Sequence, residues 1–405
     1  MFGDIADTAA MPWMTKKVIE QRYEFVSLAR VPGANVAALC RRFGLSRACA
    51  YKWLKRFAAG GKSALADCSR RPARSPARLR ARQEQALVEL RRAHPSWGAR
   101  KLLARLAQCG QKDLPAASTA HAVLVRYGLI DPQAASAHRP WQRFERAEPN
   151  ELWQMDFKGH FALGNTQRCH PLTVLDDHSR YALGLKACTG QTEPEVRGHL
   201  EQIFALYGLP RQILCDHGPP WGNGAAPERW TALGVWLLRL GIGLSHGRPR
   251  HPQTQGKDER FHRTLQAELL ARRDLLDPLQ AQQAFDHWLG IYNTERPHQA
   301  LSMATPVTRY QLSPRPWPAS LPPIQYAPEL IVRTVRSYGV LTWQNRSFGL
   351  GRAFAGLPVA LQPTATDGLY TVQFCHQLLG AIDLRIPAPP KHQLQSLLPL
   401  PDTFT

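Results

Sequence analysis

Three acidic residues occupy positions where carboxylates could do chemistry. Asp156 lies within the largely apolar stretch LWQMDFKGHF, Asp216 directly follows QILC, and Glu259 lies in HPQTQGKDERFHRTL. Strand alternation would place Asp156 on the face opposite to Met155 and Phe157. A buried carboxylate without a partner is strongly destabilising, so the sequence predicts a compensating group beside Asp156.

A divalent cation would be such a group. Two carboxylates about 4 Å apart repel by about 4 kcal/mol at an effective dielectric constant near 20. All-oxygen ligation favours Mg²⁺ or Mn²⁺, and two ions about 4 Å apart can hold the attacking and leaving oxygens of a phosphoryl transfer. Taken singly, Asp216 is also typical of a turn and Glu259 of a helix N-terminus.

Neighbouring residues offer alternative ligands. The run 176–178, Asp-Asp-His, is better explained as a polar turn between two strands. Asp258 precedes Glu259, and successive helical residues point about 100° apart, so only one of the two can face a site. His262 and Arg263 share a helix face with Glu259 and are candidate DNA-phosphate contacts, with a solvent-facing role equally open.

Several other chemistries find no support. The sequence has no Gly-x-Ser-x-Gly elbow and no Walker loop, which argues against a serine hydrolase and against ATP use. The eight cysteines are scattered without a Cys-x-x-Cys pair, which argues against a zinc site or a disulfide framework.

Five stretches in order resemble the integrase core of bacterial insertion-sequence transposases of the DDE type, which are relatives of retroviral integrases with an RNase H-like fold. They are LWQMDF, PLTVLDDHSRYALG, DHG, HPQTQGKDERFHRTL and YNTERPHQALSMATPVTRY, spanning about residues 151–310. The resemblance implies that Asp156, Asp216 and Glu259 form the metal-binding catalytic triad. It also implies DNA strand cleavage and strand transfer.

Two departures from that family pattern concern the second acid. His217 stands where the family usually has Asn, and we interpret it as a loop residue rather than a ligand. The number of residues between Asp216 and Glu259 is 42, more than is usual in the family, and the Gly- and Pro-rich stretch after His217 accounts for the extra length.

Several predicted strands are followed by interleaved helices, and this order predicts an α/β core with a mixed sheet. The three acids lie on elements of this core. The C-terminal region reads as five short strands, which suggests a small all-β barrel. We expect the following boundaries in this half of the chain: catalytic core 150–311, Pro-rich linker 312–328, β-barrel 329–388 and tail 389–405.

The N-terminal half reads as all-α. A short helix, a Gly-containing turn and a basic helix capped by Ser46 predict a helix-turn-helix domain over residues 1–65. A basic linker 66–83, a second helical unit 84–131 and a linker 132–149 follow; the second unit is either another helix-turn-helix or a spacer. The candidate DNA contacts are Arg47, Lys52, Lys55, Arg56, Arg70 and Arg71.

Charge supports a polyanionic partner. The net charge is +20, and residues 1–150 contain 27 Lys and Arg against 11 Asp and Glu. Together with the resemblance and the three acids, this charge leads us to predict a DNA transposase that acts with Mg²⁺ or Mn²⁺ on double-stranded DNA as a homo-oligomer. A catalytically inactive DNA-binding regulator and a structure-selective nuclease are the alternatives. The absence of a long apolar run or signal peptide predicts a cytoplasmic, nucleoid-associated protein without a membrane partner.

Overall fold

The computed structural model describes residues 17–68, 79–130, 145–216, 218–222, 230–246, 256–388, 390 and 394–398. The chain divides into two compact units, Met1–Arg78 and Leu79–Thr405. The first unit contains helices α1 (Val18–Ala29), α2 (Val36–Phe43) and α3 (Arg47–Gly60), followed by a short 3₁₀ turn, Lys62–Leu65. No described helix in either unit combines the length and apolar character needed to cross a membrane.

The turn between α2 and α3 follows the prediction. Gly44 adopts a left-handed conformation, φ 63°, which glycine reaches without a steric penalty. The side chain of Ser46 accepts a hydrogen bond from the backbone N–H of Cys49 at 3.2 Å and so caps α3. Phe25 and Trp53 are buried where the three helices meet.

The second unit begins with three more helices, α4 (Ala81–Ala93), α5 (Ala99–Gln108) and α6 (Ala117–Arg126). They pack around their own buried apolar residues. Polar contacts join them to the α/β core, where Arg105 pairs with Glu295 at 2.7 Å and Ser96 donates to Glu268 at 3.0 Å.

A mixed sheet forms the α/β core, as predicted. Its strands are β1 (Leu152–Phe157), β2 (Phe161–Ala162), β3 (Arg168–Asp176), β4 (Ala182–Cys188), β5 (Gln212–Cys215) and β6 (Gly243–His246). The order is β2-β3-β1-β5-β6, with β4 also paired to β3. Strand β3 is antiparallel to β1 and β4, whereas β5 is parallel to β1 and β6. The antiparallel β1–β3–β4 meander followed by parallel strands matches the expected fold class.

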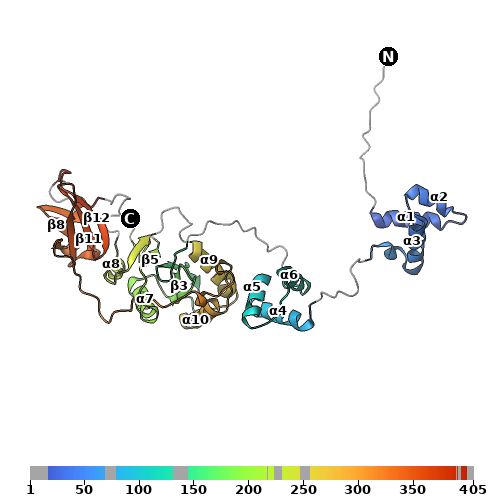
Figure 1. The fold of residues 1–405 in the computed structure, drawn as a ribbon, viewed down its shortest axis with the longest axis horizontal. Helices are drawn as coiled ribbons and strands as arrows, with labels where there is room; N and C mark the ends of the chain where they lie inside the picture. The colour runs from blue at the N-terminus through green and yellow to red at the C-terminus, as the bar shows by residue number, and fades with distance from the viewer. Residues whose placement is uncertain are drawn as a thin grey trace, which may run out of the picture. The chain divides into compact units, whose positions relative to one another are not determined.

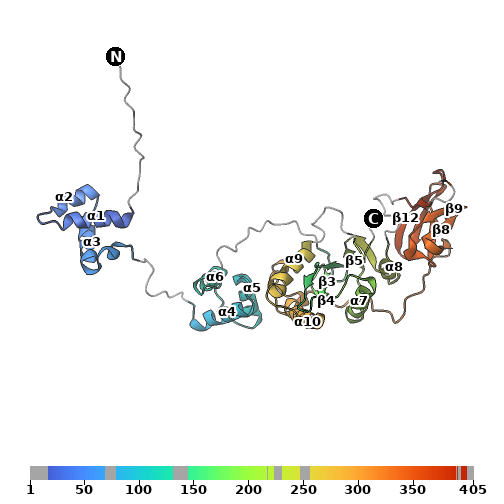
Figure 2. The same ribbon diagram turned by 180° about the vertical axis from the view of Figure 1, so that it is seen from behind.

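Helices cover both faces of this sheet (Figures 1 and 2). Helices α7 (Glu193–Tyr207) and α8 (Ala232–Arg239) bury one face together with Trp153 and Met155. The other face packs against α9 (Gly256–Leu265) and α10 (Pro278–Thr294), and a π-helical turn, Gln266–Leu270, extends α9.

The C-terminal part is all-β, as predicted, and in the part of the chain that the structure describes its strands do not close into a single barrel. Its strands form two sheets, β12-β11-β10-β7 and β13-β9-β8. The turn Ser337–Gly339, in which Tyr338 has φ 64°, separates β7, which pairs with β10, from β8, which pairs with β9. The strands are β7 (Ile331–Thr334), β8 (Val340–Trp343), β9 (Arg346–Gly349), β10 (Pro358–Pro363), β11 (Leu369–Phe374), β12 (Gln377–Asp383) and β13 (Gln395–Ser396).

Short 3₁₀ turns complete the second unit. They are Gln299–Leu301, Pro306–Thr308, Ser337–Gly339 and Arg352–Phe354. The apolar core of the β domain includes Val235 and Leu238 of α8, so this domain packs directly against the α/β core.

Candidate active site

Asp156 lies near the end of the central strand β1. Alternation turns its neighbours Trp153 and Met155 into the α7–α8 core, where both are fully buried, and turns Asp156 to the opposite face. The Asp156 side chain is 26% exposed, and its Oδ1 accepts a hydrogen bond from the backbone N–H of Phe157 at 2.8 Å. The central strand therefore holds one carboxylate at the protein surface.

Asp216 directly follows β5, the parallel neighbour of β1. The pairing joins Leu152 to Gln212 and Gln154 to Leu214, a constant offset of 60 positions. Extending that register by two residues brings Asp216 level with Asp156. Equivalent positions on adjacent parallel strands project to the same side of a sheet. The side chain of Asp216 is exposed, and its Oδ1 accepts from the backbone N–H of Gly218.

Glu259 lies in the first turn of α9 and is exposed, whereas its neighbour Asp258 is buried. Within the described part of the chain, Asp258 Oδ1 is buried without a hydrogen-bond partner. Burial raises the pKa of Asp258 well above its usual value, and Asp156 and Asp177 add to that effect. Of the two acids, only Glu259 reaches solvent.

Electrostatics place the three predicted acids in one neighbourhood. Burial, together with the charges of Asp216 and Glu259, raises the pKa of Asp156 to about 6 against the opposing effect of the Phe157 N–H. The oxygen atoms of the three acids do not all lie within 4.8 Å of one another, a distance met within the described residues only by Cys188, Glu195 and His199.

His262 faces inward from α9. The Thr173 hydroxyl donates to the Asp156 backbone oxygen at 2.9 Å, so it accepts from His262 Nε2–H, also at 2.9 Å. His262 Nδ1 then lies 4.0 Å from Asp156 Oδ2. Burial and the nearby Lys158 lower the pKa of His262 to about 4, so the ring is neutral at pH 7. Arg263, the other predicted phosphate contact on α9, is exposed.

Asp177 connects the start of α9 to the sheet. Its fully buried carboxylate forms an ion pair with Lys257, and Asp177 Oδ1 also accepts from Gln154 Nε2 at 2.7 Å. Asp177 Oδ2 accepts from the backbone N–H of Arg146 at 2.8 Å. The sequence analysis did not predict this anchor, because the two charged residues are 80 positions apart.

The preceding Asp176 behaves as a turn residue. It accepts from the backbone N–H of Ser179 at 2.8 Å and from the backbone N–H of Asn150 at 2.8 Å. The polar-turn interpretation of residues 176–180 therefore agrees with the contacts seen for Asp176.

The predicted DNA contacts of the first unit lie on α3. Arg47, Lys52 and Lys55 are exposed, and Arg56 is half-buried with its guanidinium 5.1 Å from the centre of the Trp53 ring. A residue that the sequence analysis missed is Tyr51, which is 59% exposed. Its place midway between Arg47 and Lys55, at helical i+4 spacing, was the available signal. Arg70, Arg71 and His217 lie outside the described residues.

The order of these elements agrees with known protein families. The family model "Integrase core domain" matches residues 146–252, and a second model of the same description matches residues 240–306. Residues 146–306 are thus similar to an integrase core. The resemblance to insertion-sequence transposases with a retroviral-integrase-like core is thus confirmed. A "Helix-turn-helix domain" model matches residues 21–73, a "Homeodomain-like domain" model matches 49–124, and "IS481 family transposase, C-terminal domain" matches 330–388.

Individual relatives align mainly with part of this protein. The "Insertion element IS407 uncharacterized 31.7 kDa protein" of Burkholderia multivorans is 28% identical over 158 residues, which is 39% of this chain and 54% of the relative. The Gag-Pro-Pol polyprotein of Mason-Pfizer monkey virus is 33% identical over 117 residues, covering 29% of this chain and 6% of the polyprotein. This chain thus spans about half the length of the insertion-element relative.

Among solved structures, the HTLV-2 integrase catalytic core domain in complex with magnesium is similar to the integrase core. Its sequence identity is 19%, and the TM-score is 0.31. The match covers 41% of this chain and 99% of that structure.

Proposed function

We propose that this protein is a DNA transposase that cleaves DNA at the ends of an insertion sequence and transfers the freed strands to target DNA. The observation that carries the proposal is the common register of Asp156 and Asp216 on adjacent parallel strands, with Glu259 close enough to raise the pKa of Asp156. Three carboxylates near the carboxyl ends of β1 and β5 and the start of α9 suit phosphoryl transfer far better than they suit a purely structural role.

Asp156, Asp216 and Glu259 would hold the divalent ions, Mg²⁺ or Mn²⁺, and two ions are proposed. The donor set fits, because it consists of carboxylate oxygens, which hard cations prefer. The raised pKa of Asp156 also fits, since a cation would relieve the desolvation and the repulsion that cause it. Asp216 and Glu259 are exposed, so side-chain rotation can bring their oxygens closer together. When bound, such ions would activate water and stabilise charge on the phosphate.

In the proposed reaction, a water oxygen bonds to the phosphorus at the element's end while the bond to the 3′ oxygen breaks. The water loses a proton and the departing 3′ oxygen gains one, which leaves a 3′-hydroxyl. That hydroxyl then attacks a target phosphodiester in line, and a second 3′-hydroxyl leaves. No side chain forms a covalent bond to DNA.

The protein's own task is to keep the carboxylates in place. The N–H of Phe157 fixes one oxygen of Asp156, and Thr173 ties the Asp156 backbone to His262 of α9. The buried pair of Lys257 and Asp177 anchors α9 two residues before Glu259. Preorganised ligands of this kind avoid the loss of free energy that ordering them during the reaction would bring.

For DNA recognition, we propose that α3 contacts the terminal inverted repeats through Arg47, Lys52, Lys55 and Arg56, with Arg70 and Arg71 on the backbone beyond it. Arg263 is proposed to contact DNA near the cleavage site. His262 is neutral and half-buried, so as a DNA contact it would serve only as a hydrogen-bonding group. Cutting and joining two element ends would require a homo-oligomer on DNA.

The deciding experiment compares end cleavage and strand transfer in Mg²⁺ for Glu259→Gln and Asp258→Asn. These neighbouring acids lie on the same turn, but only Glu259 is exposed. We expect Glu259→Gln to lose activity by roughly a hundredfold or more, and Asp258→Asn to retain it. Equal losses would overturn the choice of Glu259. A wild-type protein that binds terminal DNA without cleaving it would instead support the inactive regulator.

A further inference from the structure

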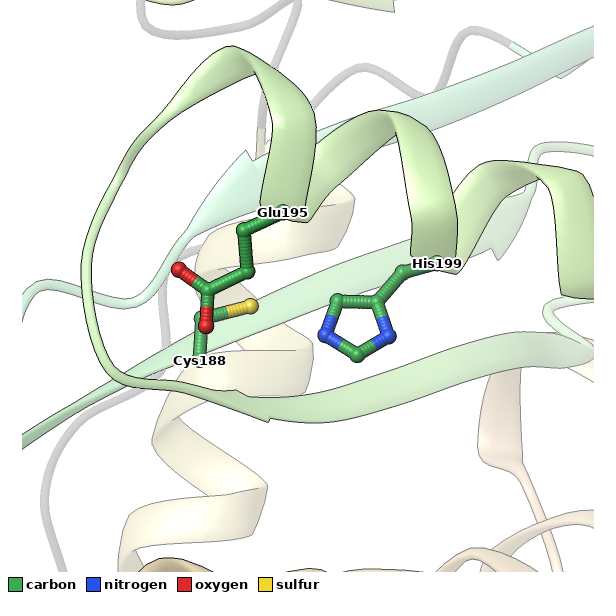
Figure 3. A group of neighbouring side chains, drawn as sticks. All are labelled: Cys188, Glu195 and His199. Carbon is green, nitrogen blue, oxygen red and sulfur yellow. The ribbon is translucent and has the colours of Figure 1, made fainter.

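A second group of metal-ligating side chains lies away from the three proposed catalytic acids. Cys188 ends β4, and Glu195 and His199 stand one turn apart on α7. One ligand atom from each lies within 4.8 Å of those of the other two. Figure 3 shows the Cys188 sulfur between the carboxylate of Glu195 and the imidazole of His199. Strand and helix thus present three different donor types to one point.

This group occupies the opposite face of the sheet from Asp156. Cys188 is buried in the apolar core beneath α7, together with Met155. Because Met155 and Asp156 are consecutive residues of β1, their side chains project to opposite faces. The two sites therefore cannot share an ion.

The chemistry of the donors identifies the class of ion. A thiolate, an imidazole nitrogen and a carboxylate oxygen are the ligand types of Zn²⁺, whereas Mg²⁺ takes oxygen ligands. The thiolate of Cys188 is the ligand that favours Zn²⁺ over Mg²⁺. Three protein ligands leave a fourth tetrahedral position, which a water molecule can fill.

The protonation states are compatible with metal loading. Burial lowers the pKa of His199, and Lys186 lowers it further, so the imidazole is neutral and keeps a lone pair for a metal at pH 7. Burial and the charge of Glu195 raise the pKa of Cys188 to about 12, so a metal would displace the thiol proton.

Glu195 already has a structural task that leaves room for a cation. Its Oε1 accepts from the backbone N–H of Thr189 at 2.7 Å and its Oε2 accepts from that of Gly190 at 3.0 Å. These bonds orient the carboxylate on the segment that joins β4 to α7. Oε1 also accepts from the Thr189 hydroxyl at 3.3 Å. A carboxylate oxygen has two lone pairs, so Oε2, which accepts one hydrogen bond, retains a position for a metal.

We propose that Cys188, Glu195 and His199 form a site for Zn²⁺ that ties the end of β4 to α7 and stabilises the integrase core. The sequence analysis argued against a zinc site, because the three ligands lack the paired Cys or His spacing of familiar zinc motifs. The proposal does not depend on the proposed transposase activity.

The test uses Co²⁺ as a spectroscopic probe of the full chain after removal of metal with a chelator. We expect a thiolate-to-Co²⁺ absorption band that saturates at one equivalent of this site per chain and is displaced by Zn²⁺; Co²⁺ held by the carboxylates of the proposed catalytic site gives no such band. Cys188→Ala should abolish the band. Cys169→Ala is the matched control, since Cys169 is an equally buried cysteine that packs on the other face of the same sheet. A band that survives in Cys188→Ala, or that Cys169→Ala also abolishes, would overturn the site.

Three further variants exclude misleading outcomes. His199→Gln alters a half-buried residue and should weaken Co²⁺ binding by roughly tenfold or more even if Cys188→Ala folds poorly. Cys68 and Cys109 are exposed thiols that could bind cobalt on their own. If the band comes from Cys188, replacing both of them with serine should leave it unchanged. Asp156→Asn should also preserve the band while removing activity. Failure of the transposase proposal would therefore not affect this result.

Discussion

Asp156 and Asp216 differ by 60 positions, the same offset as the three residue pairs of the parallel strands β1 and β5, so the register continued two residues past Gln154 and Leu214 brings them level. Neighbouring strands are about 4.8 Å apart. Two carboxylates that project from adjacent strands to one face repel, and the charge of Asp216 accordingly helps to raise the pKa of Asp156; a cation between them would relieve that repulsion. This relationship underlies the first two predictions.

Replacing either aspartate by asparagine should abolish DNA cleavage and strand transfer, by roughly a hundredfold or more, because asparagine supplies one neutral ligand oxygen in place of a charged carboxylate. Binding to terminal DNA should persist, since the proposed recognition helix lies in the other unit. Asp113→Asn, an exposed acid of the helical region, is the control. Activity retained in both Asp156→Asn and Asp216→Asn would exclude this carboxylate site.

Asp156→Asn should stabilise the metal-free protein at pH 7. The pKa of Asp156 is raised to about 6 in the folded state, so the folded state binds more protons than the unfolded state between about pH 4 and 6. Stability therefore falls as pH rises through that window. Relative to the wild type, the free energy of unfolding of the variant should be higher by about 1–3 kcal/mol above pH 6 and unchanged below pH 4. Urea unfolding at pH 4 and pH 7 in the presence of a chelator measures this; a destabilised variant at pH 7 would show that Asp156 has a cationic partner.

His262→Gln should change the acid limb of the stability curve. The pKa of His262 is lowered to about 4, so the unfolded state binds more protons between about pH 4 and 6.5, and stability is lost as pH falls through that range. On going from pH 7 to pH 4, the free energy of unfolding of the variant should fall by about 2–3 kcal/mol less than that of the wild type. Glutamine can still donate to Thr173. The curves for His262→Gln and wild type would superimpose if the ring were solvated.

Lys257→Met should destabilise the second unit by about 3–5 kcal/mol, because it leaves the buried carboxylate of Asp177 without its cation. The double variant Asp177→Asn, Lys257→Met should lose less than the sum of the single losses, and urea unfolding of the full cycle gives the difference. Strictly additive losses would mean that the pair does not interact. Loss of strand transfer under conditions where Lys257→Met remains folded would link this anchor to the position of Glu259.

On α3, Arg47→Ala and Lys55→Ala should each weaken DNA binding. Each should also lower, by about one, the steepness with which the logarithm of the binding constant falls with the logarithm of the salt concentration (the salt slope). Tyr51→Ala should weaken binding while leaving that slope unchanged, because the ring carries no charge. Lys17→Ala, an exposed cation at the start of α1, is the control. Affinities for terminal DNA at several salt concentrations decide this, and a reduced slope for Tyr51→Ala would argue against a direct contact by the ring.

Much of the fold follows from local sequence. Ser46 caps α3 and Gly44 takes the left-handed turn because both effects involve residues three or four positions apart. The alternation around Asp156 indicates that its side chain faces away from the α7–α8 core. The apolar run before Asp216 forms a strand, as predicted. The all-β character of the C-terminal part was predicted, but not the division of its described strands into two sheets, because sheet closure depends on how distant strands pair rather than on how many there are.

The sequence by itself determined which acids stand at strand and helix ends, together with the helical and strand segments that carry them. Only the tertiary structure decided which side chains meet: Asp156 level with Asp216, Lys257 against Asp177, and Cys188 beside His199. The physical reason is range. Caps, turns and alternation depend on backbone geometry within a few residues, whereas these meetings depend on sheet register and helix packing, which residues far apart in the chain fix together.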